Sequence, residues 1–227
     1  MRTIENTLTR PVSGGCRVVE PCVCPPTPRQ LGRIDEADRA LLAKVLSEPT
    51  EYIEHPLFDQ ADAETILFGE PAIRHGLSTH FEEARSADPP DGHGSALSSA
   101  QEILLFQRFN YARLRIARLV SRYNNKSMPT DAVRELLAWT HRAVEARGQI
   151  VQANIPLVLA MAKRTRLSGL DFNELISEGN FALLRSADKF DCARGFKFST
   201  YACRAILKSF SRVALRTSRY RGRFPTE

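Results

Sequence analysis

The stretch RGFKFSTYACRAILKSF, residues 194–210, combines two patterns that decide the fold. In its first half three aromatic residues alternate with basic and hydroxyl residues, as they would in a half-buried strand. Its second half runs on without a turn signal, and Ile206 and Phe210 recur there at helical spacing. A strand cannot continue directly into such a helix. We therefore predict a loop followed by a helix that Ser199 or Thr200 caps.

A row of basic residues follows this predicted helix at four-residue spacing. Residues four apart are neighbours on a helix surface, so the row predicts a cationic ridge. The ridge consists of Arg204, Lys208, Arg212 and Arg216 and continues in Arg219, Arg221 and Arg223. It can neutralise a phosphate backbone, with binding that weakens as salt rises. The alternative is a solvated helix face, which is less favoured because nearly all the charge has one sign.

The three aromatic residues lie at the foot of the ridge and are Phe196, Phe198 and Tyr201. Rings interleaved with cations suit unpaired bases, and each stacked base is worth about 1–3 kcal/mol. A single aromatic residue is more often part of the core, and for Phe198 this alternative is equally favoured. The pattern predicts an aromatic platform that binds single-stranded nucleic acid, beside a cationic ridge that binds the duplex.

The preceding stretch GLDFNELISEGNFALLRSADKFD, residues 169–191, also has a helical period. Its apolar positions predict that Glu174, Ser177 and Glu178 share the outer face. An acidic patch on a basic protein fits a docking surface for a basic partner, although an ordinary solvated face is the alternative. Gly179 lies within this helix, where glycine is unfavourable, and predicts the close approach of another backbone.

Two further helical patterns precede this region. The first, ALSSAQEILLFQRFNYARLRIARLVSRY, opens with Ser98 or Ser99 as a cap. The second, PTDAVRELLAWTHRAVEARGQIVQANIPLVLAMAKRTR, contains Pro156. Because proline is tolerated only in the first turn of a helix, we predict a break there, with Asn154 capping a new helix.

The chain divides by composition into four parts. Residues 1–30 are rich in Pro, Gly, Ser and Thr and predict a flexible leader. Residues 31–95 contain a helical segment and then a Pro/Gly-rich linker, with a domain boundary near Gly94. Residues 96–215 form the predicted helical domain, and residues 216–227 a basic C-terminal tail.

Composition narrows the class of protein. The 227 residues are 43% hydrophobic, enough for a core, and carry a formal net charge of +6, which favours an anionic partner such as nucleic acid. Five scattered cysteines argue against a disulfide framework or a zinc site and for the cytoplasm. The sequence contains no apolar run of membrane-spanning length and no phosphate loop, nucleophile elbow or zinc-protease helix. We expect neither an enzyme nor a cofactor.

Residues 153–212 resemble region 2 of the sigma-seventy family of bacterial RNA polymerase sigma factors. The motifs ELISEGN, DKFD and RGFKFSTYA carry the resemblance in their order and spacing. LSSAQEILLFQRFNYARLR resembles the end of the preceding conserved region, so the likeness covers roughly residues 96–215. It implies an all-α fold: a compact helical domain preceded by a partly disordered, partly helical N-terminal extension.

The resemblance implies two interfaces. One binds core RNA polymerase through the clamp helices of its largest subunit and corresponds to Glu174, Ser177, Glu178, Asn180 and Leu184. The other recognises the melted non-template strand of the minus-ten promoter element, with a flipped adenine held against aromatic residues. Its pocket corresponds to Phe196, Lys197, Phe198, Thr200 and Tyr201, its other strand contacts to Asn154 and Arg194, and its upstream duplex contacts to Lys208 and Ser211. From the ridge we add Arg204 and Arg212 as phosphate contacts.

The sequence also departs from the family. Two tryptophans that commonly form a wedge in the family are replaced by Arg204 and Ala205, and glutamine is usual at Ser177 and Lys208 and arginine at Leu207. The sequence holds no helix-turn-helix domain for the minus-thirty-five element, so we expect a fragment or a naturally reduced factor. The alternative function is an interaction module that occupies polymerase, or an anti-sigma partner, without productive promoter melting.

Overall fold

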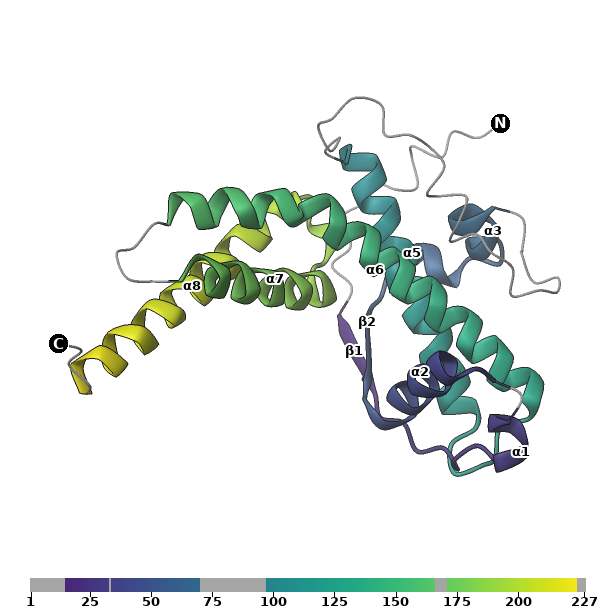
Figure 1. The fold of residues 1–227 in the computed structure, drawn as a ribbon. Helices are drawn as coiled ribbons and strands as arrows, with labels where there is room; N and C mark the ends of the chain where they lie inside the picture. The colour runs from purple at the N-terminus through teal and green to yellow at the C-terminus, as the bar shows by residue number, and fades with distance from the viewer. Residues whose placement is uncertain (1–14, 33, 70–96, 166–170, 224–227) are drawn as a thin grey trace.

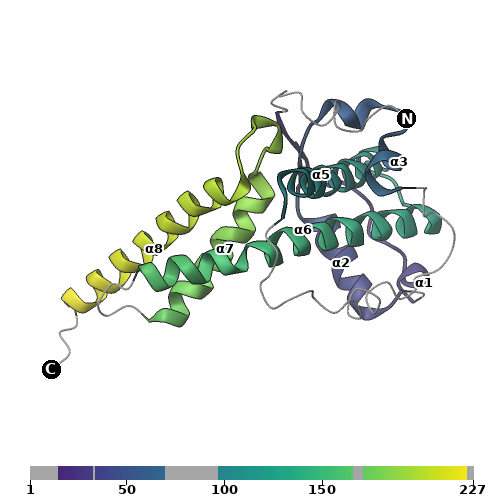
Figure 2. The same cartoon turned by 90° about the horizontal axis from the view of Figure 1, so that it is seen from above.

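The computed structural model describes residues 15–32, 34–69, 97–165 and 171–223. Four long helices dominate it: α5 (Ser99–Arg122), α6 (Thr130–Arg164), α7 (Phe172–Lys189) and α8 (Phe198–Arg223). Helix α6 runs through both halves of the molecule (Figures 1 and 2). It packs against α5 along one half and against α7 and α8 along the other. The predicted helical fold class is confirmed, with one small sheet added.

The sheet pairs β1 (Cys16–Val19) with β2 (Thr50–Ile53) in antiparallel register. Cys16 lies opposite Ile53, whose N–H donates to Asn110 Oδ1 on α5 at 3.0 Å. A short helix, α1 (Pro28–Leu31), follows β1. The prediction that residues 1–30 form a flexible leader is therefore wrong for residues 16–19, which pair with a strand distant in sequence, and for residues 28–30, which begin α1.

The remaining N-terminal elements lie against the α5–α6 pair and share its core. They are α2 (Glu36–Ser47), the 3-10 helix η2 (Pro56–Asp59) and α3 (Ala63–Phe68). Leu42, Leu57 and Leu67 from these elements belong to the same buried cluster as Phe106 and Trp139. The boundary predicted near Gly94 lies outside the described residues. The segments on its two sides do not form separate cores.

Helix α6 continues through Pro156, so the predicted break is wrong. The proline ring removes one backbone N–H from the helix and clashes with the preceding turn, which bends a helix without necessarily ending it. Figure 1 shows α6 changing direction along its length. Asn154 does not cap a new helix. Its side-chain amide donates to the Ile150 carbonyl at 2.8 Å, which adds a hydrogen bond within the preceding turn.

The last helix is longer than predicted. Helix α8 runs to Arg223, so most of the residues predicted as a basic tail are helical. Its first residue is Phe198, which places Ser199 and Thr200 inside the first turn, where neither is the residue that precedes the helix.

Gly179 lies where α6, α7 and α8 meet, but the predicted close approach of another backbone is wrong. The close neighbours are side chains and not a backbone. A Cβ on residue 179 would lie 2.5 Å from Val158 Cγ1 and 3.1 Å from Phe210 Cε1. Both neighbours are buried, so neither can move aside freely. Glycine is needed at this crossing for packing.

We expect Gly179→Ala to lower the free energy of unfolding by about 1–2 kcal/mol. Overpacking costs about 1–3 kcal/mol, and the better helix propensity of alanine offsets up to about 1 kcal/mol of it. Urea denaturation followed by circular dichroism measures the change. Gly148→Ala is the matched control, because its Cβ would meet nothing within 4 Å and should stabilise α6. Equal stability of the two variants would contradict the packing role of Gly179.

Candidate nucleic-acid and protein interfaces

The loop between α7 and α8 is held by hydrogen bonds to the buried carboxylate of Asp191, which accepts them. Its Oδ1 accepts from the Ala193 N–H at 2.9 Å, and its Oδ2 accepts from Arg194 Nε at 3.2 Å. A 3-10 turn, η3 (Cys192–Arg194), follows Asp191, and Gly195 then adopts φ +74°, a conformation that favours glycine. These contacts give the loop one defined path into α8.

Helix α8 begins against a carboxylate from α5. The Phe198 N–H donates to Glu102 Oε1 at 2.8 Å, across 96 residues of sequence. A negative charge at a helix N-terminus accepts from its free N–H groups and favours the helix dipole. Glu102 thus takes the capping position predicted for Ser199 or Thr200, and it fixes the start of α8 relative to α5.

The three predicted stacking rings separate into two groups. Phe196 is 67% exposed and Tyr201 is 42% exposed, so both can offer a ring face to a base. Phe198 has no exposed surface. Its ring centroid lies 5.1 Å from that of Phe106 and 5.2 Å from that of Phe190. The assignment of Phe198 as a DNA contact is therefore corrected: it is a core residue.

Although Phe198 is buried, it supports the candidate surface by packing beneath it. Its neighbour Phe190 is buried and lies 5.6 Å, between ring centroids, from Tyr201. The buried rings of Phe106, Phe190 and Phe198 thus form a base on which the exposed Tyr201 ring rests. This arrangement limits the orientations that Tyr201 can take.

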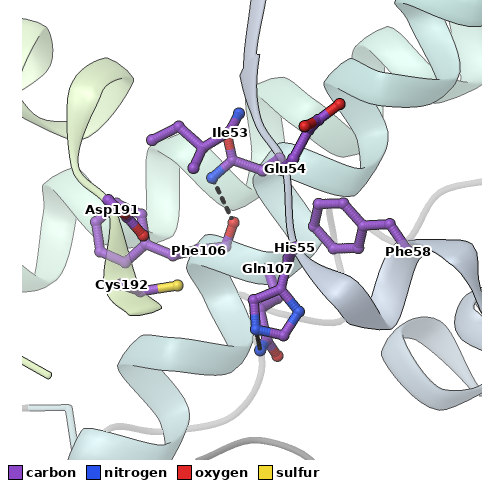
Figure 3. Close-up of a pocket in the computed structure, with 9 residues that line it drawn as sticks. Ile53, Glu54, His55, Phe58, Phe106, Gln107, Asp191 and Cys192 are labelled. Carbon is purple, nitrogen blue, oxygen red and sulfur yellow. Dashed lines mark hydrogen bonds between the residues drawn. The ribbon is translucent and has the colours of Figure 1, made fainter. Parts of the chain in front are cut away.

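A small pocket lies beneath the loop (Figure 3). Residues of the N-terminal segment, of α5 and of the start of η3 line it. His55 Nδ1 accepts from the Leu57 N–H at 3.2 Å, so a neutral imidazole carries its proton on Nε2. Gln107 Nε2 lies 3.3 Å from that nitrogen, and Gln107 Oε1 is buried without a partner among the described residues. Because two donors oppose each other, the reversed amide, with its oxygen toward His55, is the orientation that would form a hydrogen bond with this tautomer. Burial lowers the pKa of His55, which favours this neutral form.

Cys192 lines the same pocket. Burial raises the pKa of its thiol to about 12, so it stays protonated at neutral pH. A thiol that stays protonated is neither a nucleophile nor a metal ligand. Among the residues that the structure describes, no group of three or more His, Cys, Asp or Glu side chains could hold a metal ion.

The outer face of α7 carries most of the predicted polymerase contacts. Glu174 and Ser177 are exposed, and Leu184 is half-buried. Asn180 is less accessible to a partner, because its Oδ1 is buried; this atom has no hydrogen-bond partner among the described residues. Phe181, which the sequence analysis missed, is 58% exposed. The sequence pattern that could have indicated it is an apolar residue that lies out of phase with the buried positions of α7.

Glu178 differs from the other members of this face because α8 already binds it. Arg216 Nη2 donates to Glu178 Oε1 at 2.6 Å, and Ser209 Oγ donates to Glu178 Oε2 at 3.1 Å. The Arg216 hydrogen bond holds the pKa of Glu178 below its ordinary value, and the Ser209 bond acts in the same direction. The predicted acidic patch is partly neutralised within the chain.

The cationic ridge also divides. Arg204, Lys208 and Arg212 are exposed, and none pairs with a described acidic residue within 4.0 Å. Four residues span about 400°, so each step of four advances about 40° around the helix. The drift carries Arg216 toward α7, where it meets Glu178. The predicted straight row of four is thus three free cations and one paired cation.

Of the other predicted DNA contacts, three lie on the loop or the first turn of α8, and two lie away from it. Lys197, Thr200 and Arg194 are exposed on the loop and the first turn of α8, and Arg194 is tied to Asp191. Ser211 is exposed and donates its hydroxyl to the Leu207 carbonyl at 3.0 Å. Asn154 lies half-buried on α6, and the hydrogen bonds of the described residues do not join it to α8.

Comparison with known proteins identifies this part of the chain. Residues 150–220, from within α6 through α8, match the family model described as Sigma-70 region 2. The chain therefore contains a sigma-70 region 2. The match includes α7, the loop and the first 23 residues of α8, from Phe198 onward.

Individual relatives agree with the family model. The RNA polymerase principal sigma factor HrdC of Streptomyces coelicolor is 45% identical over 85 residues, which are 37% of this chain and 25% of that protein. RNA polymerase sigma factor SigA1 of Synechococcus elongatus is 41% identical over 91 residues, 40% of this chain and 22% of that protein. SigA of a Nostoc species is 40% identical over 92 residues, 40% of this chain and 23% of that protein. The similarity thus spans about a quarter of the length of these relatives.

Helices of the described ranges are too short or too polar to cross a membrane.

Proposed function

We propose that this chain acts in transcription initiation by binding core RNA polymerase and helping it to recognise and melt the minus-ten promoter element. The observation that carries the proposal is that the sigma-70 region 2 match contains two exposed rings, Phe196 and Tyr201, at the start of a helix bearing exposed cations. Rings beside cations suit an unpaired strand, where bases stack and phosphates are neutralised.

The polymerase would bind the outer face of α7. Exposed apolar surface flanked by carboxylates, as Phe181 is by Glu174 and Glu178, fits a partner surface with an apolar centre and basic rim. The polymerase would form the phosphodiester bonds. This chain would contribute binding free energy and no catalytic group.

The DNA would bind the loop and α8. Unpaired bases, including a flipped adenine, would stack on Phe196 and Tyr201. Phosphates would contact Lys197 and the three exposed ridge cations, Arg204, Lys208 and Arg212. Arg204 stands where the family commonly places a tryptophan. A guanidinium can pair with a phosphate or stack on a base, so it replaces part of the lost ring contact.

The test combines the chain with core polymerase and a promoter duplex whose minus-ten region is premelted. We expect the complex to bind this bubble more tightly than the fully paired duplex, with protection of the non-template strand from permanganate or nuclease. Binding to polymerase with no preference for the bubble would contradict promoter melting and would favour the alternative, a module that occupies polymerase without opening DNA.

For the protein interface, we expect Phe181→Asp to weaken binding to core polymerase by about tenfold or more. A central apolar contact of an interface contributes about 2 kcal/mol or more, and a buried carboxylate adds a desolvation penalty. Val144→Asp is the matched control, because Val144 is an exposed apolar residue on α6 outside the proposed face. Surface plasmon resonance with immobilised core polymerase measures both. Equal losses in the two variants would contradict docking through α7.

For the ridge, we expect affinity for single-stranded DNA to fall steeply with salt. Each neutralised phosphate contributes about −0.7 to the slope of log affinity against log salt concentration. The exposed ridge cations Arg204, Lys208 and Arg212 would thus contribute about −2 to this slope. Arg212→Gln should make it shallower by about 0.7 in a fluorescence anisotropy titration. A slope that this substitution does not change would remove Arg212 from the phosphate contacts.

A further inference from the structure

The outer face of α7 and the cationic row of α8 meet at one cluster. Arg216 Nη2 lies 2.6 Å from Glu178 Oε1 and 3.9 Å from Glu174 Oε1. The buried hydroxyl of Ser209 occupies the other oxygen of Glu178. Both carboxylate oxygens of Glu178 are therefore bound by groups on α8. One side of this cluster belongs to the proposed polymerase interface and the other to the helix proposed to bind DNA.

The cluster can open without disturbing the packing of the two helices. The side chains of Arg216 and Glu178 are 61% and 28% exposed, so solvent or a ligand can reach the pair. The α7–α8 contact itself rests on buried groups, among them Gly179, Phe210 and Val213. Breaking the ion pair removes a surface interaction and leaves that core in place.

We propose that Arg216 couples the two interfaces, so that occupation of the α7 face releases a cation for nucleic acid and occupation of α8 by a phosphate releases Glu178 for polymerase. This inference rests on the function proposed above. A basic group of the polymerase that binds Glu178 would displace Arg216. The freed guanidinium, one turn beyond Arg212, would then extend the row of phosphate contacts.

The coupling is reciprocal by thermodynamic necessity. A ligand that needs one partner of a closed pair binds with an affinity reduced by the fraction of molecules in which the pair is open. Each ligand opens the pair for the other, so each binds more tightly when the other is present, by the same factor. The free chain would thus bind DNA less well than the chain on polymerase.

The first experiment measures affinity for core polymerase without DNA. We expect Arg216→Gln to bind about two- to fivefold more tightly than the wild type, the range expected for a partly exposed ion pair. Arg134→Gln is the matched control. Arg134 forms an exposed pair with Asp131 on the far half of α6, and its loss should leave polymerase affinity unchanged.

The second experiment measures affinity for a single-stranded oligonucleotide without polymerase. Glu178→Gln should free Arg216, raise the affinity about two- to fivefold and make the salt slope steeper by about 0.7. Asp131→Asn removes one negative charge from the exposed control pair. If it raises the affinity as much, net charge explains the gain, and the coupling is overturned.

The outcomes separate the inference from the proposed function. If wild type binds polymerase and Arg216→Gln binds equally well or less well, the coupling is overturned while polymerase docking stands. If neither binds, both proposals are overturned. If only Arg216→Gln binds, the ion pair blocks the docking face, and the coupling is supported.

Discussion

Replacing Phe196 and Tyr201 together with alanine is expected to weaken binding of the unpaired non-template strand by about 30-fold or more. Each base stacked on an aromatic ring is worth about 1–3 kcal/mol, so two rings contribute about 2–6 kcal/mol. Both rings are exposed, so their removal leaves the core intact. Fluorescence anisotropy of a labelled oligonucleotide, in the presence of core polymerase, measures the loss.

Two controls assign this loss to stacking. Phe172→Ala removes a ring as exposed as that of Tyr201 from the start of α7, and it should leave strand affinity unchanged. Fully paired duplex offers no free base face, so its affinity for the double variant should fall much less. A fall of the same size for strand and duplex would show that the two rings do not stack on unpaired bases.

Phe198→Ala is expected to have the largest effect on stability. Truncation of a buried phenylalanine costs about 3–5 kcal/mol, and the whole free energy of unfolding of a domain is about 5–15 kcal/mol. Phe198 is fully buried between Phe106 and Phe190, so the cavity would lie in the aromatic base beneath Tyr201. Urea denaturation should show the loss, and strand affinity should fall because Tyr201 is no longer held.

A conservative substitution distinguishes support from contact. Phe198→Leu keeps most of the buried volume and should restore both stability and strand binding, because a supporting residue needs volume and not a ring face. Phe196→Leu should leave stability unchanged and still weaken strand binding, because leucine cannot stack. A stable Phe198→Leu variant that fails to bind the strand would return Phe198 to the DNA contacts.

Local patterns predicted much of the helical architecture and the approximate site. The stretch that opens into Ile206 and Phe210 predicted α8, and Ser98 caps α5 as expected. Exposure of Phe196 and Tyr201 agrees with their position among cations. These features depend on residues within a few turns of one another, where helical periodicity and capping chemistry act directly.

The features that the sequence did not predict depend on distant partners. Strand β1 forms only because β2 lies beside it, and α8 begins at Phe198 because Glu102 accepts its N–H. Helix α6 continues through Pro156, since packing on both sides holds the helix together. The drift of Arg216 toward Glu178 follows from helix geometry, but its partner became known only from the fold.

The bond between Glu102 and Phe198 bears on which part of the chain can fold autonomously. Residues 150–220 contain the proposed DNA and polymerase contacts on α7, the loop and α8, but neither the carboxylate that starts α8 nor Phe106, which packs against Phe198. An excised fragment of that range would expose apolar rings and leave the first N–H of α8 without its acceptor. The smallest autonomous unit must therefore include α5, and a recombinant fragment should begin before its Ser98 cap.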